Sequence, residues 1–261
     1  MDKLVRWGFM LYLIFIIGII FGSFYNVVGM RLPNGESIVK PGSHCPKCGH
    51  ILSWYENIPL ISYIMLCGSC KKCKKTISST YFLMELLSVA LFALCYKVFG
   101  INVNFFLSLI IVSLVIIIFV SDSKYMIIND SPLVIAVILI FFIKWYDVGI
   151  INALISLLFG FGIFAIAYLL RLFGYLVFKQ EALGGGDIKL SFVGGMLVGI
   201  DFGVVYIVLA SFLALPYAIY VTLKNKDKML PFGPFLVASL LIVFLNFDTF
   251  KGLLDFLFFI N

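Results

Sequence analysis

Apolar residues form long, nearly uninterrupted blocks along this chain, and most charged residues lie in the segments between them. Four blocks approach or exceed the roughly 20 residues that carry an α-helix across a lipid bilayer. They are Trp7 to Val28, Tyr81 to Phe99, Ile101 to Val120 and Phe202 to Leu223. Further candidates are Pro132 to Trp145, Ile151 to Phe178 and Phe232 to Phe247, with a short, glycine-rich one from Ile188 to Ile200. The pattern predicts an all-α integral membrane protein with about eight transmembrane helices.

The composition agrees with this prediction. Of the 261 residues, 63% are hydrophobic and 12% are charged, against about 25% charged in a typical soluble domain. The first block follows Lys3 and Arg6, as the apolar part of a secretory signal would. It is longer than a signal requires, however, and no small-residue cleavage site follows it. We therefore expect it to remain as the first transmembrane helix.

The positions of Lys and Arg predict the orientation in the membrane, because cytoplasmic loops are enriched in both. On one side, alternation through the predicted helices collects Arg31, Lys40, Lys47, Lys71, Lys72, Lys74, Lys75, Lys124, Arg171, Lys179, Lys189, Lys224, Lys226 and Lys228. The other side receives Lys3, Arg6, Lys97, Lys144 and Lys251, together with both termini. We expect the first side to be cytoplasmic. The net charge of +6 also suits a lipid bilayer with anionic headgroups. The sequence has no basic patch interleaved with aromatic residues, so it does not indicate a nucleic-acid partner.

The polar segment after the first block contains two Cys-x-x-Cys pairs, Cys45 with Cys48 and Cys70 with Cys73. Each pair places two thiolates on one turn, and two pairs complete the tetrahedron that Zn²⁺ prefers. Thiols stay reduced in the cytoplasm, so zinc is favoured over disulfides. Four sulfur ligands leave no open position, which indicates a structural zinc. The predicted organisation is a first transmembrane helix (1–30), a small cytoplasmic zinc-binding domain (31–78) and a polytopic membrane domain (79–261).

The choice of ligands leaves one alternative open. Cys67 stands three residues before Cys70 and offers another second pair, although Cys70 with Cys73 is preferred. His44 and His50 flank the first pair and are interpreted as ordinary loop residues. Cys95 lies inside the second apolar block, where a thiol usually serves as a small packing group.

Two aspartates lie at the ends of apolar blocks. Asp122 follows the block that ends at Val120, and Asp187 closes the run Gly184-Gly185-Gly186 and opens the next apolar block. The predicted topology places both at the cytoplasmic side. Ionisable groups at membrane depth are costly and usually functional, whereas a single carboxylate at a helix end also fits a solvated or capping role.

The three glycines before Asp187 favour a functional interpretation, because they allow close backbone approach. A glycine-rich turn also suits phosphate at a helix N-terminus, but no Walker lysine follows and Asp187 would repel an anion. Two aspartates that share a proton suit peptide hydrolysis, since one takes a proton from water while the other donates to the carbonyl. The two histidines both lie beside the first cysteine pair, so Ser-His and His-Glu-x-x-His chemistries are unavailable.

Several motifs occur in an order that resembles a known family. They are Gly22 to Pro33, the two cysteine pairs, Trp54 to Pro59, Ile77 to Glu85, Asp122, Gly184 to Asp187, and Pro231 to Pro234. In this order they resemble the type IV prepilin peptidases, bifunctional leader peptidase/N-methyltransferases of bacterial pilus, secretion and competence systems. Gly184 to Asp187 falls on the family's Gly-x-Gly-Asp motif. The chain departs at Asn129, where the family usually has proline, and at Cys67, where it often has arginine.

The resemblance implies a membrane aspartic endopeptidase in the bacterial cell membrane, multi-pass, with its active site facing the cytoplasm. Asp122 and Asp187 would be catalytic, Gly184 and Gly186 would shape the approach of the substrate, and Lys189 would tune the charge of the site. The substrates would be prepilins or pseudopilins, and S-adenosylmethionine would donate a methyl group to the new N-terminus. For Glu85, a role in methyl transfer and a role as a buried carboxyl that anchors the second helix stay open.

Two other functions are compatible with part of the pattern. A polytopic transporter would explain the helices, the intramembrane carboxylates and the glycines. It would not explain two aspartates on one side together with a zinc-binding domain. An inactive membrane scaffold for pilus assembly is the second alternative. Replacing both aspartates without effect on substrate processing would favour it.

Overall fold

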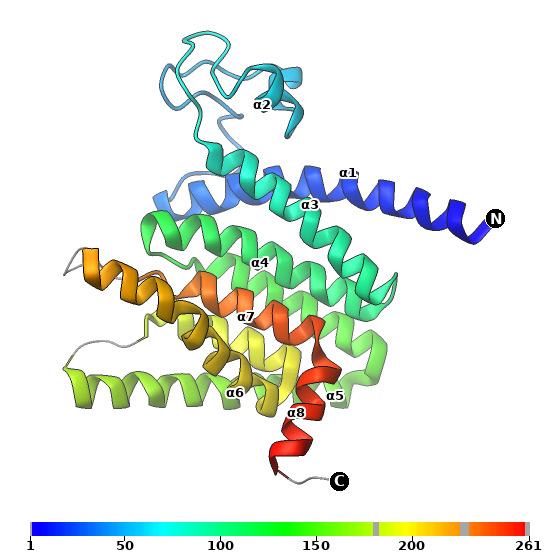
Figure 1. Cartoon of the computed structure of the whole chain (residues 1–261), viewed down its shortest axis with the longest axis vertical. Helices are drawn as coiled ribbons and strands as arrows, with labels where there is room; N and C mark the ends of the chain where they lie inside the picture. The colour runs from blue at the N-terminus through cyan, green and yellow to red at the C-terminus, as the bar shows by residue number, and fades with distance from the viewer. Residues whose placement is uncertain (1, 180–182, 225–229, 259–261) are drawn as a thin grey trace. The chain divides into compact units, whose positions relative to one another are not determined.

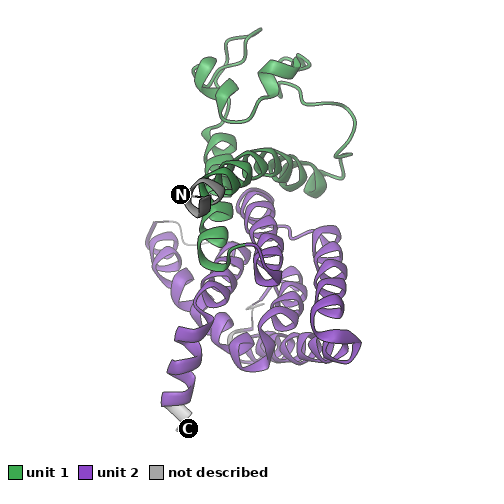
Figure 2. Cartoon of the chain, turned by 90° about the vertical axis from the view of Figure 1, so that its right-hand side faces the viewer, with its two compact units in different colours: residues 1–100 green, residues 101–261 purple. Residues whose placement is uncertain are grey.

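The computed structural model describes residues 2–179, 183–224 and 230–258, and these are predominantly helical (Figure 1). Contacts divide the chain into unit 1, residues 1–100, and unit 2, residues 101–261 (Figure 2). The only extended pairing in the described ranges consists of two isolated β-bridges. The predicted all-α class is therefore confirmed. Lys226 and Lys228, which contributed to the predicted orientation, lie outside the described residues.

Unit 1 is built on two long apolar helices, α1 (Asp2–Arg31) and α3 (Ser79–Phe99). They pack closely because α1 has glycines where α3 approaches. A Cβ atom on Gly22 would lie 2.8 Å from Cβ of Ser88, and the Ser88 hydroxyl donates to the carbonyl of Gly18 at 3.1 Å. The segment between the two helices contains the 3₁₀ helices η1 (Leu32–Asn34) and η2 (Trp54–Asn57) and the short helix α2 (Ile61–Met65).

Unit 2 contains α4 (Val103–Tyr125), α5 (Asp130–Phe178), α6 (Gly185–Lys224), α7 (Gly233–Leu245) and α8 (Phe247–Phe258). Two of these helices are much longer than a bilayer requires. Each breaks at a glycine with a positive φ, Gly149 in α5 (85°) and Gly199 in α6 (82°), so each forms two arms. Five of the described helices are long and apolar enough to cross a membrane, or six if α7 and α8 form one bent span. Counted by arms, α1, α3, α4 and α7 with the two arms of α5 and of α6 give eight apolar segments, the number of the predicted helices.

The first arm of α6, residues 185–198, lies at the centre of unit 2. A Cβ atom on Gly195 would lie 2.7 Å from the carbonyl oxygen of Phe159 in α5, so α5 and α6 touch through backbone. At the far end of this arm, Nζ of Lys144 donates to the carbonyls of Met196 and Leu197. A helix end leaves such carbonyls without partners inside the helix. Lys144 thereby fixes one end of the arm, and Asp187 stands at the other.

The C-terminal helix α8 turns by 85° from α7. Its start is held by the rings of Phe202 and Phe247, whose centroids are 4.2 Å apart. In membrane proteins, a helix that turns away from a span in this way commonly lies along the bilayer interface. Along the described part of α8, Phe247, Phe250 and Leu254 share one face, while Asp248, Lys251 and Asp255 share another.

Candidate active site and metal centre

Asp122 lies in the last turn of α4 and is buried. Its Oδ2 atom accepts a hydrogen bond from the backbone N–H of Gly233 at 3.0 Å. Gly233 is the first residue of α7, where backbone N–H groups have no partner within the helix and carry a partial positive charge. The start of α7 therefore holds one oxygen of the Asp122 carboxylate in place.

Asp187 lies in the first turn of α6 and is also buried. Its Oδ2 atom accepts from the backbone N–H of Gly184 at 3.1 Å, so the side chain folds back over the glycine run. Its Oδ1 atom is buried and has no hydrogen-bond partner among the described residues. A buried carboxylate oxygen without a partner is costly and marks this atom as the one able to bind a further group.

Ile128, in the loop between α4 and α5, lies between Gly233, which supports Asp122, and Gly186, the residue directly before Asp187. A Cβ atom on Gly186 would lie 2.7 Å from Cβ of Ile128, and one on Gly233 would lie 2.8 Å from its Cδ1. Both glycines therefore close on the same side chain. The N-terminal starts of α6 and α7, each next to one of the two carboxylates, therefore meet at Ile128.

Lys189 follows Asp187 by two residues in α6, but its ammonium group contacts a different carboxylate. Its Nζ atom is 2.7 Å and 2.8 Å from the two oxygens of Asp130, in the first turn of α5. Both side chains are exposed. Lys189 thus joins the starts of α5 and α6, and the sequence pattern gave no sign of this pair.

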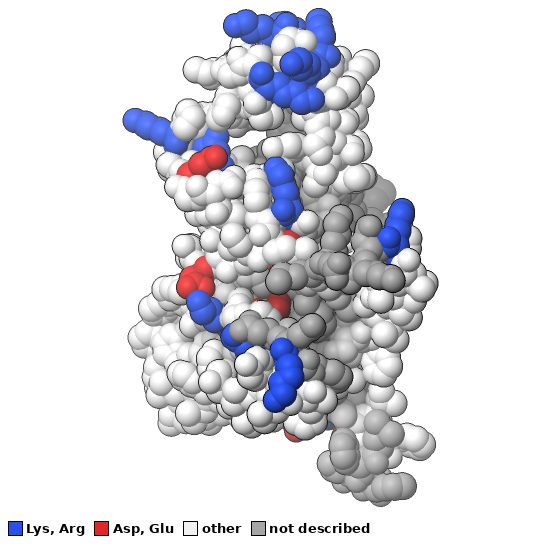
Figure 3. All heavy atoms as spheres, turned by 90° about the vertical axis from the view of Figure 1, so that its left-hand side faces the viewer, with Lys and Arg blue, Asp and Glu red and all other residues white. Residues whose placement is uncertain are grey.

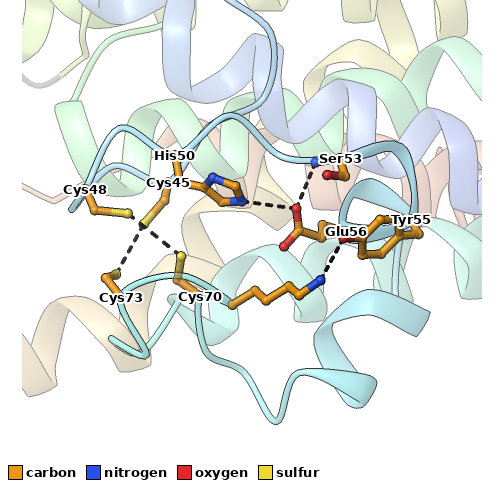
Figure 4. Close-up of polar contacts among 9 residues, drawn as sticks. Cys45, Cys48, His50, Ser53, Tyr55, Glu56, Cys70 and Cys73 are labelled. Carbon is orange, nitrogen blue, oxygen red and sulfur yellow. Dashed lines mark hydrogen bonds and ion pairs between the residues drawn. The ribbon is translucent and has the colours of Figure 1, made fainter.

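The second candidate site is a cluster of four cysteines in unit 1 (Figure 4). The sulfur atoms of Cys45, Cys48, Cys70 and Cys73 all lie within 4.8 Å of one another. Cys45 to Cys73 and Cys48 to Cys70 are each 3.9 Å apart. Zn–S bonds of about 2.3 Å in a tetrahedron place neighbouring sulfurs about 3.8 Å apart. The cluster therefore fits Zn²⁺ with shifts of the sulfur atoms of about 1 Å or less.

The two cysteine pairs have the same backbone design. In the first, the N–H of Cys45 donates to the carbonyl of His50, and the N–H of Gly49 donates to the carbonyl of Cys45. In the second, Cys70 donates to Lys75 and Lys74 donates to Cys70. The backbone N–H of Lys47 lowers the pKa of Cys45 to about 7, whereas burial and the neighbouring thiols raise the pKa of Cys48 to about 11. A bound Zn²⁺ would hold all four sulfurs as thiolates.

The remaining candidates lie outside the sulfur cluster. Cys67 is exposed and does not belong to the group of four, and Cys95 is buried within α3. Nδ1 of His44 lies 3.0 Å from the carbonyl of Gly42. Nε2 of His50 lies 3.2 Å from Glu56, so neither histidine faces the sulfurs as a ligand.

Glu56 was missed by the sequence prediction. It is buried, its Oε2 atom accepts from the backbone N–H of Ser53 at 2.8 Å, and this hydrogen bond lowers its pKa. Ser53 and Glu56 form a capping box on η2 (Figure 4). The Ser-x-x-Glu spacing in the sequence is typical of such a box and could have revealed it. The other carboxylate of interest, Glu85, is buried in α3 and accepts from the N–H of Leu60 at 2.8 Å.

Comparisons with known proteins match one family model to each of the two units. The bacterial peptidase A24 N-terminal domain matches residues 16–99, and the type IV leader peptidase family matches residues 109–219. A prepilin leader peptidase/N-methyltransferase of Vibrio cholerae is 32% identical over 243 residues, which cover 88% of this chain and 94% of the relative. One from Bacillus subtilis is 34% identical over 256 residues, 92% and 96% of the two chains. No solved structure matches the chain.

The fold and these matches define a class, the multi-pass membrane peptidases. Within that class, the chain belongs to the type IV leader peptidase family. The resemblance seen in the sequence motifs is confirmed. Nothing in the comparisons supports the transporter alternative.

Proposed function

We propose that this protein is a membrane aspartic endopeptidase that removes the short basic leader of prepilin-like proteins, with Asp122 and Asp187 as the catalytic pair. One observation carries the proposal: two buried carboxylates, each held by a glycine N–H, converge around Ile128. Relatives that cover most of the chain carry the name prepilin leader peptidase/N-methyltransferase. The family and the geometry thus support the same reaction.

In the proposed reaction, the two carboxylates share one proton. The ionised member takes a proton from water, and the resulting hydroxide attacks the scissile carbonyl while the neutral member donates its proton to the carbonyl oxygen. Collapse of the tetrahedral intermediate passes a proton to the leaving nitrogen. The products are a leader with a free carboxylate and a mature chain with a free amine. Oδ1 of Asp187, which has no hydrogen-bond partner in the described ranges, is the atom best suited to hold the water.

The substrate would be a prepilin or pseudopilin whose basic leader precedes an apolar helix. The apolar helix would lie among the spans, and the leader would stay at the cytoplasmic side, where the Lys and Arg pattern places the starts of α5 and α6. Gly184 and Gly186 leave room for backbone to approach Asp187. Lys189 would act on the substrate only indirectly, because Asp130 already neutralises its charge.

A second activity would follow cleavage. The new N-terminal amine would accept a methyl group from S-adenosylmethionine, which leaves as S-adenosylhomocysteine, and the ammonium proton would pass to solvent. The names of the relatives support this activity. Glu85 remains a candidate for it, beside its observed role as partner of Leu60.

Zinc would be held by Cys45, Cys48, Cys70 and Cys73 and would serve the fold of unit 1. Four thiolates fill a tetrahedral site and leave no position for water or substrate. The metal would therefore fix the two cysteine turns against each other, and with them the segment that carries η2 and α2.

The test is the intact mass of a prepilin-like substrate after incubation with purified, lipid-reconstituted protein and S-adenosylmethionine. Wild type would be compared with Asp122→Asn, Asp187→Asn and Asp147→Asn. Asp147→Asn is the matched control, because Asp147 is an exposed aspartate of α5 in the same unit. We expect wild type and the control to remove the leader and add a methyl group, and the other two variants to leave the substrate intact. Cleavage by both would overturn the two-aspartate mechanism and favour a scaffold.

A further inference from the structure

Helix α2 carries an apolar face that the described residues of the protein leave exposed. Ile61, Ile64 and Met65 are 54%, 65% and 77% exposed, and Trp54 in the neighbouring η2 is 80% exposed. Residues i, i+3 and i+4 lie on one side of a helix, so the three aliphatic residues form one surface. A polar segment that projected into water would leave this surface solvated at considerable cost.

The opposite face of α2 is fixed to α3. The backbone N–H of Leu60, directly before α2, donates to Oε2 of Glu85 at 2.8 Å. The ring of Tyr63 stacks on Phe82 of α3, with centroids 5.1 Å apart. A Cβ atom on Gly68 would lie 2.9 Å from the Tyr63 hydroxyl, so the next turn closes over the same ring. The exposed face of α2 therefore points away from α3.

These contacts also give the depth of α2 along the spanning helix. Helix α3 begins at Ser79, and Glu85 lies six residues further on. At 1.5 Å per residue, Glu85 is about 9 Å along the helix from its start. The 21 residues of α3 extend about 31 Å, close to the hydrocarbon thickness of about 30 Å. The start of α2 thus lies beside the second turn of α3, within the end of the apolar span and not beyond it in bulk water.

Charge and aromatic content fit the same location. Lys71 places Nζ 2.7 Å from the hydroxyl of Tyr55, next to Trp54. Lys and Arg side chains gather over the cysteine segment of unit 1 (Figure 3). Trp and Tyr favour the headgroup region, and basic side chains favour anionic headgroups. A surface with exposed Ile, Met and Trp beside lysines is typical of interfacial membrane contacts.

We propose that the face formed by Trp54, Ile61, Ile64 and Met65 inserts into the lipid bilayer at the interface of the leaflet where α3 begins. The segment 31–78, expected from its sequence to be a small cytoplasmic zinc-binding domain, is then anchored along the membrane surface as well as by α1 and α3. The occupant of the apolar face is phospholipid, not a second copy of the chain and not the substrate.

Tryptophan fluorescence tests this directly, because the chain has three Trp residues. Trp7→Phe with Trp145→Phe leaves Trp54 as the single reporter in the full protein, and Trp54→Phe with Trp145→Phe leaves Trp7 in α1 as a membrane-embedded control. Both would be reconstituted without substrate at a low protein-to-lipid ratio, in vesicles of phosphatidylglycerol and phosphatidylcholine brominated near the top of the acyl chain. We expect roughly half of the Trp54 emission to be quenched by the brominated lipid, with protection from aqueous iodide.

Two variants make the test specific to the apolar face. Ile64→Lys with Met65→Lys, in the Trp54 reporter, should restore iodide quenching, whereas Ile64→Leu with Met65→Leu should not. Zinc content checks that unit 1 still folds. Trp54 emission that brominated lipid leaves unchanged while iodide quenches it would place the face in water and overturn the proposal. Protection from iodide without bromine quenching would also overturn it, since a second copy of the chain would then cover the face.

Discussion

Oδ2 of Asp122 lies 3.0 Å from the backbone nitrogen of Gly233, although the two residues are 111 positions apart. This hydrogen bond indicates what the Pro-Phe-Gly-Pro motif does in the structure: the first N–H of α7 orients the carboxylate at the end of α4. The same glycine leaves no room for a side chain: a Cβ atom would lie 2.9 Å from Oδ2 and 2.8 Å from Cδ1 of Ile128.

Gly233→Ala should therefore inactivate the peptidase without unfolding it. Displacement of a catalytic group by about 1 Å costs on the order of a hundredfold in rate, and we expect a loss of this size in leader removal. Gly252→Ala in α8 is the matched control, since no atom of the described part of the chain lies within 4 Å of its Cβ position. Equal activity of the two variants would show that the bond to Gly233 does not position Asp122.

Ile128 should control the rate of cleavage more than the affinity for substrate. Ile128→Ala empties the space against Gly186 and Gly233, so both carboxylates gain freedom, and we expect kcat to fall roughly tenfold or more with little change in KM. The kcat of Ile128→Val, which lacks only the terminal methyl group, should lie between those of wild type and Ile128→Ala. Steady-state kinetics in detergent measure both constants, and a change confined to KM would contradict a positioning role.

The pair of Lys189 and Asp130 should matter little to cleavage. Exposed ion pairs contribute about 1 kcal/mol or less, so Lys189→Met should reduce the rate by less than about tenfold. Asp130→Asn should have a similarly small effect. A severe loss in Lys189→Met with a normal Asp130→Asn variant would mean that the lysine acts on the substrate itself.

The cysteine segment should become more stable when Lys74 is replaced by glycine. Lys74 has φ of 57°, and Gly49 occupies the equivalent position of the first pair with φ of 69°. A left-handed conformation costs a non-glycine residue roughly 1 kcal/mol. Lys74→Gly should therefore retain zinc against a higher chelator concentration, whereas Lys72→Gly, at a position without positive φ, should not.

The zinc content of serine variants should distinguish the cysteines that bind the metal from those that do not. Cys67→Ser should keep the metal content of wild type, because Cys67 lies outside the cluster of four. Cys73→Ser should lose zinc and destabilise unit 1, since metal binding and folding of such turns are linked. Elemental analysis of the purified proteins measures this. Metal loss in the Cys67 variant alone would show that the alternative pair binds.

The sequence predicted most of the helices because the bilayer imposes a simple rule on apolar length. It also placed the breaks between Trp145 and Ile151 and near Ile200, where the structure has Gly149 and Gly199. The short block from Ile188 to Ile200 looked weak because its glycines serve contact with neighbouring helices, as Gly195 does against Phe159. Its apolar content therefore understates its burial.

The candidate site was only partly predictable. Asp122 and Asp187 were selected from their positions at the ends of apolar blocks and from the glycine run. The residues that hold these aspartates in place could not be predicted. Ile128 is one aliphatic residue among many, and the hydrogen bond to Gly233 joins distant parts of the chain. Lys189 was associated with Asp187 by closeness in sequence, whereas the folded chain brings it to Asp130. Contacts between distant segments depend on packing, which a local pattern does not encode.

Helix α7 has 13 residues, or about 20 Å at 1.5 Å per residue. The hydrocarbon core of a typical bilayer is about 30 Å thick, so α7 is mismatched by about 10 Å. Lipid around it must become thinner, or the N–H that holds Asp122 must lie beneath the headgroups. Bilayer thickness then becomes a determinant of activity. Reconstitution in lipids of increasing chain length should slow leader removal as the carboxylates sink farther from water.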